Sequence, residues 1–216
     1  MKSRVKTDRM ESTKNYPKLI FAFVFLFLII SLAAAQNVHL ASEIERLERL
    51  AQTPGQKVNA YSRMARLYQL SGNREKALEH WMAAAYAEPG GRNDYALLEA
   101  VKCMISTGEY DKAAAELRTI LISARDLQIR YSAENLFAQL EAFKTGDYGP
   151  LSQLVFSGTN GQSILFTLWK ISDDDSYRNE LLRLFPGSVE AEIARGRTGI
   201  TAAYTPQWLL FPERNN

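Results

Sequence analysis

Residues 61–89, YSRMARLYQLSGNREKALEHWMAAAYAEP, decide the fold, because small and large apolar side chains recur in them at fixed intervals. In the first half, four residues stand at the spacing i, i+3, i+4 and i+7 of one buried helix face: Tyr61, Met64, Ala65 and Tyr68. Gly72 then interrupts the pattern, and Pro89 ends the stretch. In the second half, the same kind of face is repeated by Ala77, Trp81 and Ala84.

Two helices joined by so short a turn are expected to lie antiparallel. Ala65 and Ala77 are small enough to let the two backbones approach closely. Tyr61, Tyr68 and Trp81 would fill the remaining space. The stretch therefore predicts a helical hairpin whose aromatic residues hold its two helices together.

The hairpin pattern recurs along the chain. Gly72 and Ala77 have counterparts 36 residues later, Gly108 and Ala113, and Gly146 follows Gly108 by 38. A repeated helix-turn-helix with a period near 35 residues is typical of a helical solenoid.

These residues resemble the tetratricopeptide repeat, a helix-turn-helix motif of about 34 residues. The residues at its signature positions are Tyr61, Met64, Ala65, Tyr68, Ala77, Trp81 and Pro89. A second unit, residues 94–125, keeps the turn and the small residue but lacks the terminal proline. A third, from about Ser132, keeps only the turn, and Pro150 shortens its second helix. The resemblance implies an all-α, right-handed solenoid of two to three repeats with capping helices.

The predicted organisation has five parts. A leader occupies residues 1–35, a capping helix lies within 36–57, repeats occupy 58–157, further helices follow in 158–197, and 198–216 form an extended tail. Outside the repeats, apolar periodicity predicts helices over 38–51, 163–171, 177–184 and 189–195.

The leader combines a basic start, residues 1–18, with an uncharged apolar run, residues 19–32, followed by Ala33-Ala34-Ala35. This order is typical of a secretory signal peptide cleaved after Ala35. The alternative is an uncleaved N-terminal anchor in the inner membrane, which would confine membrane contact to residues 19–35. Both interpretations export the remaining chain to the periplasm.

The charge balance and the cysteine content bear on the binding partner and on what stabilises the fold. Six of the 26 basic residues and two of the 24 acidic residues lie in the first 18 positions, so the rest of the chain is slightly acidic. This balance disfavours nucleic acid as a partner. Cys103 is the only cysteine and cannot form an internal disulfide, so packing must stabilise the fold.

No pattern in the sequence predicts catalysis, a metal site or a cofactor. His39 and His80 lack neighbours at ligand spacing, and we expect His80 at the surface. Cys103 is expected in the core. Asp173, Asp174 and Asp175 precede a predicted helix and are interpreted as its cap.

The resemblance instead implies that a protein or peptide partner binds between the packing positions of each first helix. The positions that would face this groove are Asn59, Ser62, Arg66, Gln69, Tyr95, Leu98, Lys102 and Ile105. Ser62 and Leu98 occupy positions where the subset that binds acidic C-terminal tails has lysine. We therefore predict an envelope interaction module, not a chaperone-tail receptor.

A second hypothesis makes the protein a structural component of an envelope assembly, acting through its tail or by self-association. The apolar residues that motivate it are Trp208, Leu209, Leu210 and Phe211. Folding of this segment onto the last helices is the alternative explanation for its composition.

Overall fold

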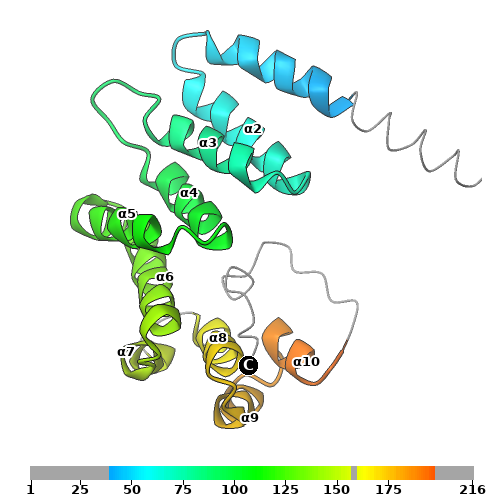
Figure 1. Ribbon diagram of the computed structural model, residues 1–216, viewed down its shortest axis with the longest axis vertical. Helices are drawn as coiled ribbons and strands as arrows, with labels where there is room; N and C mark the ends of the chain where they lie inside the picture. Colours follow the sequence, from blue (N-terminus) through cyan, green and yellow to red (C-terminus); the bar gives the residue numbers. More distant parts are fainter. Residues whose placement is uncertain (1–38, 157–159, 198–216) are drawn as a thin grey trace, which may run out of the picture. The chain divides into compact units, whose positions relative to one another are not determined.

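The computed structural model describes residues 39–156 and 160–197. The chain divides into two compact units, Met1–Arg46 and Leu47–Asn216. All regular structure in the described residues is helical, which confirms the predicted class (Figure 1). The leader and the tail with Trp208, Leu209, Leu210 and Phe211 lie outside the described residues.

The described part of the first unit, residues 39–46, is helical, and Glu43 and Arg46 form an ion pair of 2.6 Å on it. In the second unit, residues 47–51 are also helical, and Leu47 and Ala51 are buried. The helix predicted over 38–51 is therefore confirmed from residue 39 onward.

The second unit continues with a succession of helices. Their bounds are α2 (Lys57–Leu70), α3 (Arg74–Ala85), α4 (Asp94–Ser106), α5 (Tyr110–Ser123), α6 (Leu127–Thr145), α7 (Gly149–Gln153), the short 3-10 helix η1 (Leu154–Phe156), α8 (Gly161–Ser172), α9 (Asp175–Leu184) and α10 (Val189–Ala194). Within residues 47–156 and 160–197, none of these helices is long and apolar enough to span a membrane.

Local chemistry sets the helix ends. The side chains of Asn73 and Asn93 accept hydrogen bonds from the backbone N–H groups of Lys76 and Ala96, at 3.1 and 3.0 Å, and so begin α3 and α4. Gly72, Gly108 and Gly146 follow α2, α4 and α6 with φ of 78°, 83° and 77°. The left-handed conformation that ends a helix recurs at the predicted repeat interval.

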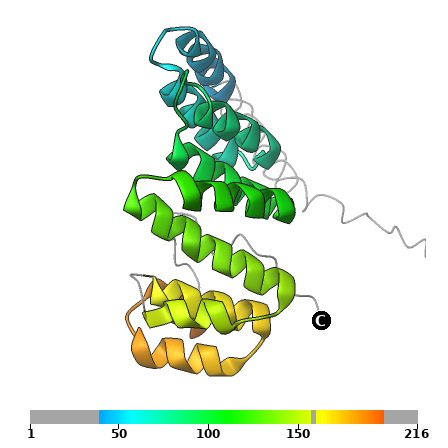
Figure 2. The same cartoon turned by 90° about the vertical axis from the view of Figure 1, so that its left-hand side faces the viewer.

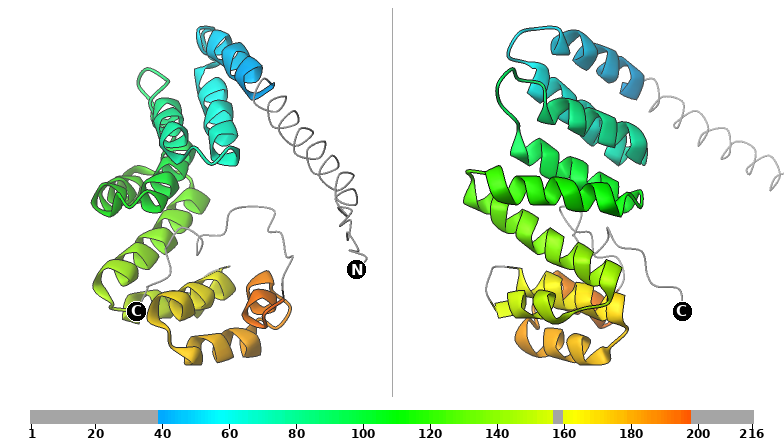
Figure 3. Two further views of the ribbon diagram at one scale, coloured as in Figure 1. Left: turned by 45° about the vertical axis from the view of Figure 1, so that its right-hand side comes forward. Right: turned by 60° about the vertical axis from the view of Figure 1, so that its left-hand side comes forward.

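Helices adjacent in the chain pack against each other from α2 to α6, and α4 also contacts α6. Figures 2 and 3 show α4, α5 and α6 side by side in chain order. Ala65, Ala77 and Trp81 are almost completely buried, whereas Tyr61 and Tyr68 are partly buried against the core. The predicted α2–α3 hairpin is thus formed as the sequence indicated.

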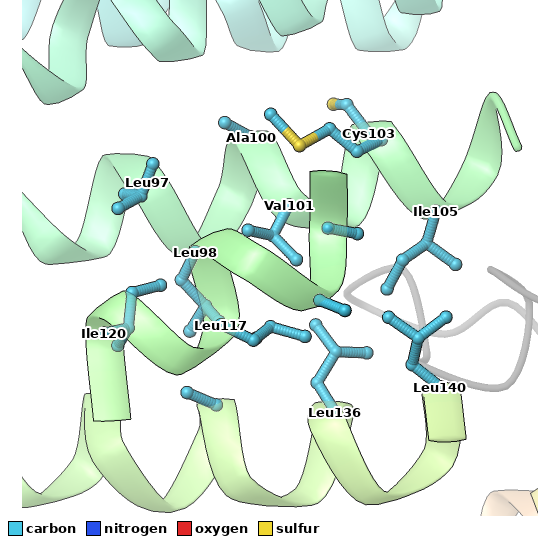
Figure 4. Close-up of a cluster of buried hydrophobic side chains, with 14 of the residues drawn as sticks. Leu97, Leu98, Ala100, Val101, Cys103, Ile105, Leu117, Ile120, Leu136 and Leu140 are labelled. Atoms are coloured by element: carbon cyan, nitrogen blue, oxygen red, sulfur yellow. The ribbon is translucent and has the colours of Figure 1, made fainter. Parts of the chain in front are cut away.

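The core continues through α4, α5 and α6. Figure 4 shows Leu97 and Val101 of α4, Leu117 of α5, and Leu136 and Leu140 of α6 in one buried cluster. Branched aliphatic side chains from three helices interdigitate there, which excludes water and fixes the helices against each other.

The C-terminal helices α8, α9 and α10 occupy the predicted segments, and α7 is a short helix containing Pro150. The helix α6 begins at Leu127, because Asp126 accepts hydrogen bonds from the backbone N–H groups of Gln128 and Ile129. Asp174 caps α9 by accepting a hydrogen bond of 2.8 Å from the N–H of Ser176, which confirms the predicted capping role for this residue of the aspartate run. Asp175 is the first residue of α9, and Asp173 instead ends α8.

Candidate functional site

The first helices of the two hairpins, α2 and α4, contact each other through side chains. Arg66 of α2 reaches Tyr95 near the start of α4, and Gln69 reaches Cys103 further along. A later residue of α2 thus meets a later residue of α4, so the two helices run in the same direction. Their neighbouring faces form one surface, which we call the α2–α4 surface.

Arg66 is the centre of this surface. Its Nη2 donates a hydrogen bond of 3.2 Å to the hydroxyl of Tyr95, and its guanidinium lies 5.9 Å from the centroid of the Trp81 ring. Trp81 and Tyr95 also meet edge to face, with centroids 6.1 Å apart. We call these three residues the Arg66–Trp81–Tyr95 cluster. Trp81 is buried, whereas Arg66 and Tyr95 are exposed, so the core orients a solvent-facing cation.

The charged residues of α4 form ion pairs with neighbouring side chains, whereas Arg66 forms none with a carboxylate in the described part of the chain. Both carboxylates of α4 are paired, Asp94 with Arg92 at 2.6 Å and Glu99 with Lys102 at 2.5 Å. The 14 residues of α2 include no acidic side chain. Across the part of the chain that the structure describes, Arg66 has no carboxylate partner. The surface therefore presents a cation whose charge is not neutralised internally.

The predicted groove residues divide into two groups. Side chains that remain at least partly accessible are those of Asn59, Ser62, Arg66, Gln69, Tyr95 and Lys102. Leu98 and Ile105 are instead only 4% and 1% exposed. The prediction that these two residues line the groove is wrong, because α4 packs against α3, α5 and α6 and most of its surface is buried. Figure 4 shows both side chains within the buried cluster.

Cys103 lies beneath the α2–α4 surface. Its thiol is buried and accepts a hydrogen bond of 3.5 Å from Nε2 of Gln69. Burial raises the pKa of the Cys103 thiol to about 11. The thiol is therefore neutral at physiological pH, which agrees with the predicted core role.

The prediction that His80 lies at the surface is wrong, because its ring is partly buried in the α2–α3 hairpin. It stacks on Tyr68 and Tyr61, with ring centroids 5.2 and 6.1 Å away. Its Nδ1 is buried without a hydrogen-bond partner in the described residues. Burial lowers the pKa of His80 below its ordinary value of 6.5. At pH 7 the imidazole is therefore neutral and packs between the helices of the α2–α3 hairpin.

Tyr131 of α6 is an accessible aromatic residue that the groove prediction omitted. It is 57% exposed and follows Tyr95, which is 44% exposed, by 36 residues. The interval of 36 residues between Gly72 and Gly108 could have identified it, but the third predicted unit keeps only the turn and does not fix the positions of its helix residues. Tyr131 is therefore a further exposed aromatic residue on α6, a helix that packs against α4.

The described residues offer little for other chemistry. No group of three or more His, Cys, Asp or Glu residues in 39–156 and 160–197 is arranged to hold a metal ion. A shallow hollow of about 540 Å³ lies at the α2–α3 turn beside Thr107, and one of about 260 Å³ lies between Val58 and Arg92. Arg92 already binds Asp94 and the Ser123 hydroxyl, so its charge is used structurally.

Comparison with known proteins identifies one shared segment. The model of a family named TP_0752_M, described as a middle domain, matches residues 153–216. This match begins at the end of α7 and continues through α8, α9 and α10, and it does not include the α2–α4 surface. No curated protein and no solved structure matches the chain.

Proposed function

We propose that the protein is a helical-repeat interaction module that binds a partner protein on the α2–α4 surface. The observation that carries the proposal is the Arg66–Trp81–Tyr95 cluster, which unites the first helices of successive hairpins around an exposed cation. Arginine and tyrosine, the two exposed members of this cluster, are among the residues enriched at binding hot spots, and the buried Trp81 supports Arg66 from beneath.

A tetratricopeptide-like solenoid is part of this proposal. Three features support it: the left-handed glycines after α2, α4 and α6, the common direction of α2 and α4, and the contact of α4 with α6. In such an array, each first helix contributes one strip of side chains to a continuous binding surface. Asn59 and Gln69 add exposed amide groups on α2 that can hydrogen-bond a partner's backbone.

We further propose that this module acts outside the cytoplasm, as the composition of residues 1–35 indicates. N-terminal sequencing of the protein isolated from its cells provides the test. A mature chain that begins at Gln36 supports export with cleavage, and an intact leader in the membrane fraction supports the anchored alternative. An intact chain recovered wholly from the cytoplasm would refute export.

Site-specific photo-crosslinking tests the binding surface. A benzophenone amino acid at Gln69 or Asn59, exposed on α2, should form a discrete adduct with the partner in living cells. The same amino acid at Thr119, exposed on α5, is the matched control and should not form that adduct. Equal adducts from Thr119 and Gln69, or no adduct from either α2 position, would reject the α2–α4 surface.

A further inference from the structure

We infer that the segment bound on the α2–α4 surface is acidic and that a side-chain carboxylate of an Asp or Glu residue pairs with Arg66. This inference rests on the proposed function and specifies its partner by charge. Its basis is the uneven charge balance of the surface together with the way in which Arg66 is held.

The charged residues of α4 all have ion-pair partners. Lys102 already pairs with Glu99, and Asp94 already pairs with Arg92. A basic segment would be repelled by Arg66 and would find no free carboxylate on α2 or α4 in the described residues. An acidic segment gains an ion pair without breaking an existing one. Charge complementarity therefore selects an acidic partner.

Arg66 is also held in place before a partner binds. A guanidinium has five N–H donors, and the structure assigns one interaction of Arg66 to the Tyr95 hydroxyl. Enough donors remain for a two-point contact with a carboxylate. The Trp81 ring and the Tyr95 hydroxyl restrict the long arginine side chain before binding. Less side-chain entropy is then lost when the carboxylate binds.

A side-chain carboxylate fits this surface better than a chain-terminal one. A terminal carboxylate bound in a repeat groove would need additional cations nearby, yet Ser62 is uncharged and Leu98 is buried and apolar. Lys102 is engaged by Glu99. One oriented arginine suits a single acidic side chain within a longer segment held mainly by other contacts.

Peptide titration of the full chain provides the test. The probes are three short peptides: an acetylated and amidated Glu-Ala repeat, the same peptide with Gln at each Glu position, and the Gln peptide with a free C-terminal carboxylate. Side-chain NMR resonances of Arg66 and Tyr95 report binding. We expect saturable shifts with the Glu peptide alone, and weaker binding as salt is raised.

Substitutions assign the contact to Arg66. Arg66→Gln should weaken binding of the Glu peptide at least about tenfold, and Arg66→Lys should give an intermediate loss because charge remains without the planar fork. Arg118→Gln is the matched control, since Arg118 of α5 also lies over an aromatic ring, that of Phe137, at 5.1 Å. It should leave binding unchanged. Thermal unfolding confirms that each variant is folded.

Several results would overturn the inference. These are equal shifts with the Gln peptide, tighter binding of the free terminal carboxylate, absence of a saturable shift at Arg66, or an equal loss in Arg118→Gln. If Gln69 or Asn59 still forms the discrete photo-adduct when one of these results is obtained, the binding surface stands and only its acidic specificity is wrong. Absence of an adduct from both α2 positions would instead refute the proposed function.

Discussion

The imidazole of His80 lies parallel to the phenol ring of Tyr68, with an interplanar angle of 1° and a centroid distance of 5.2 Å. Tyr61 stacks on the same imidazole at 6.1 Å. Because residues seven apart on a helix are separated by about 10.5 Å along its axis, the imidazole fits between the two phenol rings of α2. Lys76 lies 5.2 Å from the Tyr68 ring centroid.

This arrangement predicts loss of stability in mild acid. Burial lowers the pKa of folded His80 from its ordinary 6.5, although Glu79 and Glu48 oppose the shift and Lys76 adds to it. The unfolded chain therefore binds the proton more strongly than the folded chain does. Stability that is fully present above about pH 6.5 should be lost as pH falls from that value toward the lower folded pKa.

Thermal unfolding of the wild type and His80→Phe between pH 8 and pH 5 checks this prediction. Phenylalanine preserves a stacked ring but cannot titrate, so the other ionisable groups contribute equally to both proteins. The wild-type melting temperature should fall more steeply with acidification than that of the variant. Parallel pH profiles would show that His80 is not the titrating group.

Close approach of α2 and α3 predicts that Ala77 tolerates no larger side chain. Ala77 is completely buried in the hairpin. Ala77→Leu should lower the free energy of unfolding by about 1–3 kcal/mol, because the added atoms force the two helices apart or into strained rotamers. Urea denaturation followed by circular dichroism measures the change.

Ala115→Leu is the control for this substitution, because Ala115 is exposed on the helix α5. Its effect on the unfolding free energy should stay within about 0.5 kcal/mol. If both variants lose equal stability, tight packing at Ala77 is not the cause.

The sequence predicted the α2–α3 hairpin well because its information is local: apolar spacing, small residues and a glycine turn all lie within one stretch. Burial on the outer faces of α4 was harder to predict. Leu98 and Ile105 are buried by contacts that depend on α5 and α6, which lie later in the chain. A single-helix pattern does not reveal how many neighbours a helix has.

In the candidate site, too, the local features were predictable from the sequence and the contacts between helices were not. The sequence identified Arg66 and Tyr95 separately, as positions between packing residues. Their hydrogen bond and the ring of Trp81 beneath Arg66 depend on how α2, α3 and α4 are arranged. His80 was misjudged for a related reason, since its two tyrosine neighbours were both assigned only to helix packing.

The turn glycines predict a stability cost that depends on backbone conformation. Gly108 has φ of 83°, and no heavy atom lies within 4 Å of an added Cβ. Gly108→Ala should therefore cost about 1–2 kcal/mol through the left-handed conformation alone, without any steric clash in the surroundings. Chemical denaturation gives the change in unfolding free energy.

Gly91→Ala separates this effect from loss of glycine in general. Gly91 also has open space around it, but its φ is outside the left-handed range. Its substitution should be neutral or slightly stabilising, because alanine reduces the entropy of the unfolded chain. Equal destabilisation of both variants would contradict the conformational explanation.

A buried polar contact joins α6 to α8. The Thr167 hydroxyl of α8 lies 3.2 Å from Oε1 of Gln139 on α6, and both residues are fully buried. The same hydroxyl lies 2.9 Å from the carbonyl oxygen of Ser163. Thr167→Val removes this hydroxyl and should lower the free energy of unfolding by about 1–3 kcal/mol, because the buried Oε1 of Gln139 then loses this hydrogen bond.

A double-mutant cycle assigns this loss to the pair. Gln139→Leu combined with Thr167→Val should destabilise less than the sum of the single changes, because both polar groups are then removed together. Thr119→Val is the local control: Thr119 is exposed, and its hydroxyl bonds only the carbonyl of Ala115 among the contacts described. Additive single effects, or an equal loss from Thr119→Val, would show that Gln139 and Thr167 do not couple α6 to α8. A non-additive result establishes that the segment matched by the family model is energetically joined to the helices before it.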